Sequence, residues 1–463
     1  QAGGISYDYG RGIAVDDNGN SYITGEFEES AIFGTTTLTS SGDYDIFVAK
    51  MDHNGNWLWA KQAWGIGEDV GFSIAVDAKG NSYITGVFME SANFGTTTLT
   101  SSGDYDIFVA KLDINGNWLW AKQAGGTSDD YGYGIAVDAN GNSYVTGYFS
   151  ESATFGTTTL TSSGDIDIFV AKLDSSGNWL WANQAGGTNC DYGHGIAVDD
   201  NGNSYIIGNF LESANFGITT LTSSGYYDIF VAKLDINGNW LWAKQAGGTS
   251  YDFGNSIAVD TNRNVYVTGF FYSSSCSFGT ITLINSSSEY IDIFVAKLDI
   301  NGNWLWAKQA GGTSDDCGYG ITVDVNGNSY ITGIFRGSAT FGTTTLTSSG
   351  DFDIFVAKLG EVNSIDLPDI ISFSGIRSIY PNPFNPLTTI DYEISMPADV
   401  KIEVYNNRGQ LVRNFILGYK EQGSYKLTWE GEDNNGCLCS TGIYYIRMQA
   451  GKEIYIKKAV LLK

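Results

Sequence analysis

The chain is poor in histidine, cysteine and basic residues. Its 463 residues include only two histidines and five cysteines, which are His53, His194, Cys190, Cys276, Cys317, Cys437 and Cys439. No C-x-x-C spacing occurs, so no zinc site can be recognised. The 25 Lys and Arg stand against 51 Asp and Glu, which gives a net charge of −26. Because such a surface repels phosphate backbones, we expect no nucleic-acid partner.

Proline is absent from most of the chain. All five prolines follow residue 360, and residues 361–463 are nearly neutral, so the negative charge lies in residues 1–360. The change in composition predicts two domains, residues 1–360 and 377–463, joined by a linker over 361–376. No apolar run is long enough to span a bilayer, so we expect no membrane insertion.

Residues 1–360 consist of a repeated unit of about 61 residues. The phrase I-A/T-V-D ends at Asp16, Asp77, Asp138, Asp199, Asp260 and Asp324. A second phrase, DIFVAK, begins at Asp45, Asp106, Asp167, Asp228, Asp292 and Asp353. Six copies are therefore present.

Each unit reads as four short strands. In the third unit they cover residues 134–138, 142–149, 167–174 and 178–185, and D-x-N-G-N or S-S-G-N turns suggest tight hairpins. Repeated four-stranded units predict an all-β protein with a six-bladed β-propeller, or seven blades in a longer protein. A solenoid is the alternative, but it requires atypical capping repeats, which are not seen.

The chain begins in the middle of a phrase. QAGG at residues 1–4 ends the longer phrase WLWAKQAGG elsewhere, and the sixth unit stops at Gly360 without an NGNWLWAK strand. We therefore expect the natural protein to extend upstream of Gln1. We also expect an unpaired strand edge between residues 353 and 360.

The connections between units carry the clearest candidate site. An aspartate recurs just before each innermost strand, at Asp8, Asp69, Asp130, Asp191, Asp252 and Asp316. Six such carboxylates could ring the mouth of the channel, and calcium is the cation that oxygen ligands favour. The alternative is a turn-forming role, since Asp bonds its own following backbone. No other cofactor is expected.

Catalysis requires unlike groups in unlike roles, whereas near-identical units supply like residues in symmetric positions. We therefore expect a binding or display module rather than an enzyme, with a carbohydrate or a protein as its extracellular ligand. The alternative is a secreted hydrolase or lyase that acts on polysaccharide with the acidic face. The paired tryptophans, such as Trp118 and Trp120, could hold sugars or fill the space between blades, and the second use is commoner.

The recurring phrases D-x-N-G-N-S-Y-x-T-G and D-I-F-V-A-K-L-D-x-x-G-N-W-L-W-A resemble the SBBP type of bacterial β-propeller repeat. The resemblance covers residues 1–360. It implies a propeller fold and an exported bacterial protein, but no shared activity.

Residues 377–463 predict a seven-stranded β-sandwich. Their Y-P-N-P-F-N-P opening and G-I-Y-Y-I-R to K-K-A-V-L-L-K ending resemble the C-terminal sorting domain of type IX secretion cargo. That domain is related to the immunoglobulin-like part of flagellar hook-capping proteins. The matching residues include Tyr380, Pro381, Asn382, Pro383, Phe384, Gly442, Tyr444, Lys458 and Lys463.

This second resemblance implies that the partner is the type IX secretion machinery. It also implies a location outside a Gram-negative cell, either secreted or on the outer surface. An ordinary sandwich that only adds stability is the alternative. Neither reading explains Cys437 and Cys439, which lie two residues apart in an expected loop.

Overall fold

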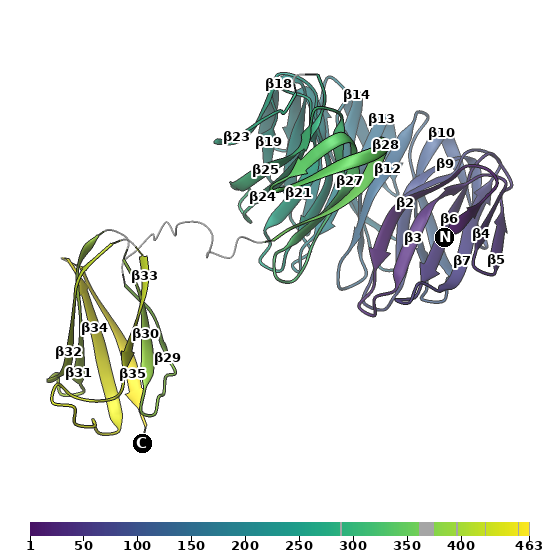
Figure 1. The fold of residues 1–463 in the computed structure, drawn as a ribbon. Helices are drawn as coiled ribbons and strands as arrows, with labels where there is room; N and C mark the ends of the chain where they lie inside the picture. Colours follow the sequence, from purple (N-terminus) through teal and green to yellow (C-terminus); the bar gives the residue numbers. More distant parts are fainter. Residues whose placement is uncertain (288, 361–374, 395–396, 422, 452, 463) are drawn as a thin grey trace. The chain divides into compact units, whose positions relative to one another are not determined.

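The structure is a computed structural model, and the residues it describes are 1–287, 289–360, 375–394, 397–421, 423–451 and 453–462. Every regular element among them is a β-strand. No helix that could cross a membrane was found in these residues. The chain forms two compact units, Gln1–Glu361 and Val362–Lys463 (Figure 1). The expected linker lies outside the described residues except for Gly375 and Ile376, which already belong to a strand.

The first unit is a β-propeller, and its third blade shows the plan of all the others. The blade consists of β12 (Asp130–Val137), β13 (Ser143–Phe155), β14 (Thr158–Leu173) and β15 (Trp179–Gly187). Each strand pairs antiparallel with the next along the chain. The D-A-N-G-N turn joins the first two strands. Gly141 in this turn adopts a φ of +79°, a backbone conformation that residues with a side chain disfavour. The predicted hairpins are confirmed.

The remaining units form blades of the same kind, although the sixth has only three strands. The first blade contains β2 (Asp8–Val15), β3 (Ser21–Phe27), β6 (Asp45–Met51) and β7 (Trp57–Gly65). The second contains β8 (Val70–Val76), β9 (Ser82–Phe94), β10 (Thr97–Leu112) and β11 (Trp118–Ala124). The fourth contains β16 (Tyr192–Val198), β17 (Ser204–Phe216), β18 (Thr219–Leu234) and β19 (Trp240–Ala246). The fifth contains β20 (Asp252–Val259), β21 (Val265–Phe271), β24 (Asp292–Leu298) and β25 (Trp304–Gly312). The sixth contains β26 (Asp316–Val323), β27 (Ser329–Phe341) and β28 (Thr344–Leu359).

The long segment between the second and third strands of each unit forms a hairpin of its own. In the third blade this hairpin is the outer part of β13 and β14, where Phe155 pairs with Thr158. The first and fifth blades have the hairpin as separate strands, β4 (Ser30–Phe33) with β5 (Thr36–Thr39) and β22 (Ser275–Phe278) with β23 (Ile281–Ile284). The last strand of one blade can pair with the hairpin of the next, as Gly187 does with Ala214. The short strand β1 (Ala2–Gly4) pairs with β4 in the same way.

The propeller core lies between blades. The hydrophobic cluster between the third and fourth blades combines Ile168 and Val170 of one blade with Phe210 and Phe230 of the other. Tryptophans close these junctions: Trp181 packs against that cluster and donates a hydrogen bond from Nε1 to the carbonyl of Ile236 at 3.1 Å. The tryptophans therefore fill the space between blades, as the commoner use predicted.

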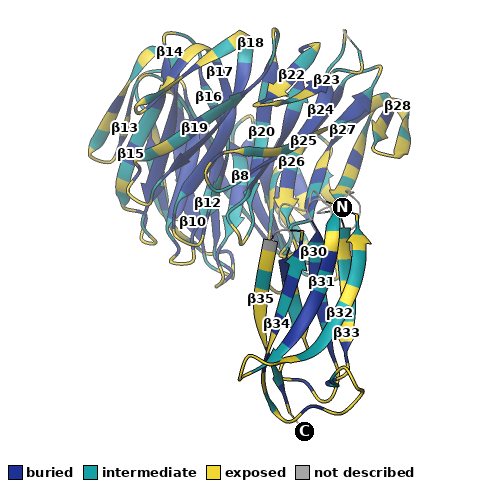
Figure 2. Cartoon of the chain, turned by 90° about the vertical axis from the view of Figure 1, so that its left-hand side faces the viewer, coloured by how far each residue is buried: buried dark blue, intermediate teal, exposed yellow. Residues whose placement is uncertain are grey.

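The propeller has one open side, between its first and sixth blades. On β2, Ile13 and Val15 are 67% and 58% exposed, and on β28, Ile354 and Val356 are 80% and 76% exposed. At the matching positions of the second and third blades the third-strand residues are fully buried. Among the described residues, strand β28 pairs only with β27, so its other edge has no partner there, as expected (Figure 2).

The second unit is an immunoglobulin-like sandwich with seven described strands. One sheet has the order β29 (Gly375–Tyr380), β30 (Thr388–Ile394) and β33 (Gly423–Trp429). The other has the order β32 (Leu411–Lys420), β31 (Ala398–Asn406), β34 (Gly442–Ala450) and β35 (Glu453–Leu461). Its core is centred on Trp429, whose ring centroid lies 5.2 Å from those of both Phe384 and Tyr444.

Candidate functional site

The innermost strands of all six blades surround one cavity of about 730 Å³. These strands are β2, β8, β12, β16, β20 and β26, and each packs beside the next. The cavity also reaches Ile331 of β27 and Val356 of β28, so it continues into the open side of the propeller.

One variable position in each inner strand presents a side chain to this cavity, alongside an isoleucine two residues later. The variable position is the third residue after the crossing aspartate, and it lies between two small residues in the pattern D-x-G-x-G/S. We call this set the cavity hexad: Arg11, Phe72, Tyr133, His194, Asn255 and Tyr319. The backbone around the hexad repeats from blade to blade, but its side chains differ in charge, polarity and shape.

Small residues on both sides of the hexad position let the inner strands pack closely: the first is glycine in all six blades, and the second is glycine in four blades and serine in two, Ser73 and Ser256. A Cβ on Gly132 would lie 2.5 Å from Thr85 Oγ1 of the preceding blade, and a Cβ on Gly134 would lie 2.8 Å from the carbonyl of His194. Both distances are shorter than any ordinary contact. Glycine therefore lets neighbouring inner strands approach, while the residue between the glycines is free to vary.

Members of the hexad contact one another. The ring centroid of Tyr133 lies 5.0 Å from that of Phe72 and 5.6 Å from that of His194. His194 Nε2 lies 2.7 Å from Asn209 Oδ1. Burial lowers the pKa of His194, so its ring is neutral at physiological pH.

The polar members of the hexad are held by neighbouring groups. Arg11 donates from Nε and Nη2 to Glu26, with the Nη2 contact at 2.6 Å. Asn255 Nδ2 donates to the carbonyl of Gly318 in the next blade at 2.8 Å. Arg11 is the only residue with a charged side chain among those that line the cavity in the described chain.

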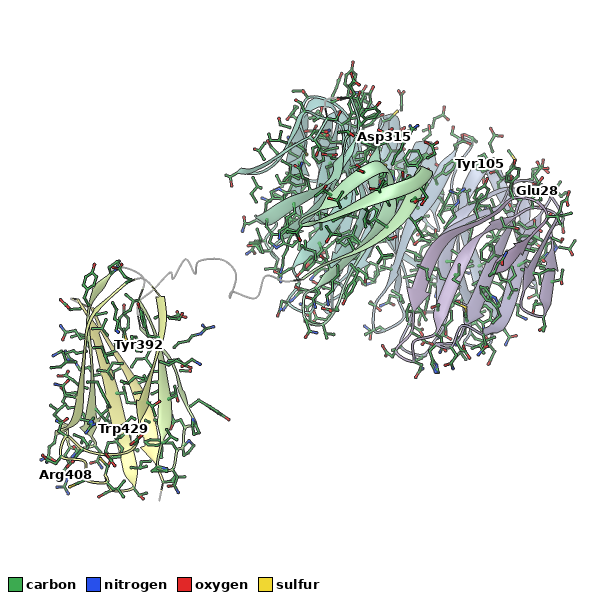
Figure 3. The ribbon with its side chains drawn as sticks, in the orientation of Figure 1. Glu28, Tyr105, Asp315, Tyr392, Arg408 and Trp429 are labelled. Carbon is green, nitrogen blue, oxygen red and sulfur yellow. The ribbon has the colours of Figure 1, made fainter. Side chains whose placement is uncertain are left out.

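A set of partly exposed aromatic rings extends from the hexad across the blades, on the face where the units connect. We call this set the aromatic arc: Tyr105, Tyr131, Tyr148, Tyr192, Tyr227, Phe253 and Phe270. Each successive pair of centroids is between 5.0 and 6.1 Å apart. Figure 3 labels Tyr105 on this face, with Glu28 and Asp315 at the same edge of the propeller. Tyr105 donates its hydroxyl hydrogen to Glu68 at 2.8 Å.

The predicted aspartates are not part of the cavity lining. Asp69, Asp130, Asp191, Asp252 and Asp316 are fully buried between blades, and Asp8 is partly buried beside the open side. Asp130 accepts hydrogen bonds from the backbone N–H groups of Gly126 and Ser150, so it ties the crossing to the second strand of its blade and does not bond the backbone that directly follows it. Each of the five buried residues instead faces the aspartate that begins the third strand of the preceding blade.

Burial is the main cause of a raised pKa at these aspartates, and the neighbouring carboxylate adds to it. The pKa of Asp69 and that of Asp130 are raised to about 8, and those of Asp191 and Asp316 to about 7. No group of three or more His, Cys, Asp or Glu side chains suited to a metal ion occurs within the described residues. The calcium site stays a prediction.

The hexad and the arc were missed in the sequence. The sequence contained a signal for the hexad, because one position varies within strands that otherwise repeat. Five of the six residues at that position were nevertheless not singled out. His194 stood out in the sequence only as one of the two histidines. No disulfide joins the cysteines among the described residues, and Cys439 is buried in the sandwich core, in the same cluster as Trp429 and Tyr444.

In the second unit, the structure brings the opening motif against the last strand. Asn382 Nδ2 donates to the carbonyl of Lys458 at 3.0 Å, and Val460 N–H donates to Asn382 Oδ1 at 2.8 Å. Phe384 continues the contact through backbone hydrogen bonds with Val460 and Leu462. Gly442 begins β34 beside Leu461, whereas Tyr380 is 76% exposed. Lys463 lies outside the described residues.

The motif residues therefore form a local structure that we call the terminal clasp, made of Pro381–Phe384 and Lys458–Leu462. Thr388 Oγ1 donates to the carbonyl of Pro381 at 2.7 Å, which fixes the start of the motif. The ring of Tyr444 contacts the ring of Trp429, which in turn contacts Phe384 of the clasp.

Family models match both units. Residues 1–26, 119–148, 180–209, 241–269 and 305–333 match the beta-propeller repeat model SBBP. Residues 386–453 match the FlgD Ig-like domain. The chain thus contains SBBP repeats and a C-terminal FlgD-type immunoglobulin-like domain.

Two curated proteins and one solved structure illustrate the likeness. The uncharacterized WD repeat-containing protein L264 of Acanthamoeba polyphaga mimivirus is 25% identical over 462 residues, covering 77% of this chain and 33% of the relative. The regulatory protein FlaEY of Caulobacter vibrioides is 25% identical over 341 residues, covering 66% and 34%. The chain therefore spans about a third of the length of these relatives. PorZ of Porphyromonas gingivalis, described as a bacterial surface component of the type IX secretion system, is 11% identical over 96% of this chain and 73% of that one, with a TM-score of 0.22.

Proposed function

We propose that this chain is an exported propeller that binds an extracellular ligand in its central cavity, and that the immunoglobulin-like domain directs its secretion. The observation that carries the binding role is the cavity hexad. Six repeated strands point six side chains at one cavity, and those side chains are chemically diverse. Such diversity at one position suits the recognition of an asymmetric ligand.

The chemistry of the cavity and the arc favours a carbohydrate. Sugar rings have apolar faces that pack on aromatic side chains and hydroxyls that require hydrogen-bond partners. Phe72, Tyr133 and the arc supply the aromatic faces, and His194 and Asn255 supply polar groups. Arg11 provides one positive charge, which suits an acidic or a neutral sugar. A protein ligand is the second candidate, but no separate observation favours it.

The same lining favours binding over catalysis. Hydrolysis of a glycosidic bond needs a pair of carboxyl groups that flank the bond. The described residues that line the cavity include no Asp, Glu or Lys. His194 contacts the neutral amide of Asn209 rather than a carboxylate or a nucleophile. We therefore propose that the chain is not an enzyme and needs no catalytic cofactor.

Isothermal titration calorimetry with soluble neutral and uronate-rich polysaccharides tests the binding role. We expect binding by the whole chain and a loss of about fivefold in affinity for Tyr133→Ala, since an aromatic contact contributes about 1 kcal/mol. Tyr419→Ala is the matched control, because Tyr419 is an exposed tyrosine of the other unit. If no polysaccharide binds, or if both variants lose affinity equally, the proposal is wrong.

The export role rests on the terminal clasp and on the match to the FlgD Ig-like domain. In a Gram-negative host with type IX secretion, deletion of residues 375–463 should leave a folded propeller in the periplasm. Fusion of the same residues to a foreign periplasmic protein should carry that protein to the surface or the medium. Normal surface appearance of the truncated chain would reject the export role without affecting the binding role.

A further inference from the structure

The side chains of the cavity hexad are distributed unevenly around the cavity. The second and third blades contribute the rings of Phe72 and Tyr133, whose centroids lie 5.0 Å apart. The fourth and fifth blades contribute the polar side chains of His194 and Asn255. The strands that carry this polar pair, β16 and β20, pack beside each other. A ligand in the cavity therefore meets aromatic surface on one part of the wall and polar groups on the next part.

The polar pair offers hydrogen-bond acceptors to a ligand, because its donors are used within the protein. His194 Nε2 donates to Asn209 Oδ1 at 2.7 Å, so the neutral ring has its lone pair on Nδ1. Asn255 Nδ2 donates to the carbonyl of Gly318 at 2.8 Å, which leaves Oδ1 as an acceptor. Within the described chain, His194 Nδ1 and Asn255 Oδ1 have no hydrogen-bond partner, and neither atom is fully buried. Two hydroxyl groups of a ligand can donate to these atoms.

The charge of Arg11 is balanced by Glu26. Arg11 Nε lies 2.9 and 3.2 Å from the two carboxylate oxygens of Glu26, and Nη2 donates to one of them at 2.6 Å. The Glu26 side chain is 3% exposed, so solvent screens its charge less than it would at the surface. A second carboxylate acts on the pair: burial is the main cause of the raised pKa of Glu26, and the charge of Glu68 adds to it. Arg11 therefore offers the cavity no surplus positive charge.

This balance separates two classes of sugar that are otherwise alike. A uronate has a carboxylate where a neutral sugar has a hydroxymethyl group, and a carboxylate that leaves water needs a positive charge as its partner. The guanidinium of Arg11 is already paired, and acceptor atoms such as His194 Nδ1 and Asn255 Oδ1 repel a carboxylate. A neutral sugar can donate hydroxyl hydrogens to the same two atoms while its apolar face packs on the aromatic rings.

We propose that the cavity selects a neutral sugar unit over the corresponding uronate, and that Glu26 determines this selection. Glu26 does not line the cavity and acts through Arg11, so it is a positioning residue. Asn209 has the same kind of role toward His194, since it fixes which ring nitrogen carries the hydrogen. The inference rests on the proposed carbohydrate-binding role and names the class of sugar that this role concerns.

Calorimetric titration of the whole chain with matched oligosaccharides tests the selection. The probes are β-linked oligomers of glucose and of mannose, each beside the oligomer of its uronate with the same linkage. The members of a pair differ only in one exocyclic group of each unit. We expect a neutral oligomer to bind about tenfold more tightly than its uronate, or more, because the uronate carboxylate finds no free positive charge.

Glu26→Gln removes the negative charge and keeps an oxygen that can accept from Arg11. This variant should bind the uronate about tenfold more tightly than the unaltered chain does. A misfolded variant cannot produce such a gain. The gain should disappear in the double variant Arg11→Gln/Glu26→Gln, which lacks the guanidinium. Glu151→Gln is the matched control, because Glu151 is an exposed carboxylate outside the cavity lining, and it should leave the selection unchanged.

Nitrogen NMR of the imidazole ring tests the acceptor at His194. The variant His53→Gln leaves His194 as the only histidine, so the ring signals need no further assignment. We expect the hydrogen on Nε2 in the free protein. Asn209→Leu should mix the two neutral forms of the ring and weaken the binding of the neutral oligomer by about fivefold.

Three outcomes would overturn the inference and leave the carbohydrate-binding role in place. One is binding of a uronate as tightly as its neutral counterpart, or more tightly. Another is an equal gain of uronate affinity in Glu26→Gln and Glu151→Gln, which would reduce the effect to overall charge. The third is a hydrogen on Nδ1 of His194 rather than on Nε2. If no oligosaccharide of either class binds, the proposed carbohydrate-binding role is rejected, and the inference with it.

Discussion

Asp167 Oδ1 of the third blade and Asp191 Oδ2 of the fourth approach the same point beside Gly186, although they come from different blades. Neither residue is exposed to solvent. The charge state of such pairs has consequences for the stability of the propeller, and other repeated contacts can be tested in the same way.

The free energy of unfolding of the propeller should fall as the pH rises from about 4 to about 8. Burial raises the pKa of Asp69 and of Asp130 to about 8 in the folded chain. The folded state then binds more protons than the unfolded state over this interval, so raising the pH destabilises it. Urea denaturation at several pH values measures the trend. Stability that is constant or that increases over this interval would contradict the prediction.

Below about pH 4 the turn aspartates should act in the opposite sense. Hydrogen bonds from the side chain and backbone of Asn81 lower the pKa of Asp77 and outweigh the effect of its burial. Protonation of Asp77 then costs stability as the pH falls. The two groups of aspartates together predict a maximum of stability in mild acid.

Asp138→Ala should destabilise the propeller by about 1–3 kcal/mol. Asp138 Oδ1 accepts hydrogen bonds from the N–H groups of Asn140 and Asn142, and Oδ2 accepts from the hydroxyl of Tyr144. Asp235→Ala is the control, because Asp235 makes the same backbone contacts in a more exposed turn without a tyrosine partner. Urea denaturation should show a smaller loss for the control. Equal losses of stability in the two variants would mean that the contact with Tyr144 does not stabilise the propeller.

The free edge of β28 should accept a strand supplied from outside. A synthetic peptide with the sequence of residues 301–310, an outer strand of the fifth blade, should pair along this edge and hydrogen-bond to its free backbone N–H and C=O groups. We expect a higher melting temperature and less self-association in light scattering. The same peptide with proline in place of both tryptophans cannot pair and serves as the control. If both peptides act alike, the edge is not the cause of association.

Removal of the terminal clasp should destabilise the second unit. Asn382→Ala loses two hydrogen bonds to the last strand, at a cost of about 1–3 kcal/mol. Phe384→Ala removes a ring that is 2% exposed, at a cost of about 3–5 kcal/mol. Asn385→Ala is the control, because Asn385 is exposed. Hydrogen exchange should become faster along β35 in the first two variants. An equal effect in the control would contradict the clasp.

The blades could be predicted from the sequence because their causes are local. D-x-N-G-N specifies a tight turn through Asp138 and Gly141, and the recurrence of the phrase repeats that turn in every unit. The use of the tryptophans between blades also followed from their size. The open edge of β28 followed from the missing strand in the sixth unit.

The site could not be predicted in the same way because its causes are not local. Phe72, Tyr133 and His194 meet only after the inner strands surround a common cavity, and no short segment contains two of them. Asp167 and Asp191 were each recognised, but their approach depends on how one blade packs on the next. The burial that raises the pKa of Asp191 arises from the same packing.

The cavity hexad separates two tasks that most proteins combine in the same residues. The small flanking residues determine how the inner strands pack, whereas the side chain between them faces the cavity and is held by a few neighbouring groups, such as Glu26 beside Arg11 and Asn209 beside His194. A duplicated blade therefore inherits a complete framework together with one replaceable side chain. Specificity could diverge in such a protein by single substitutions, one blade at a time, without renewed selection for folding.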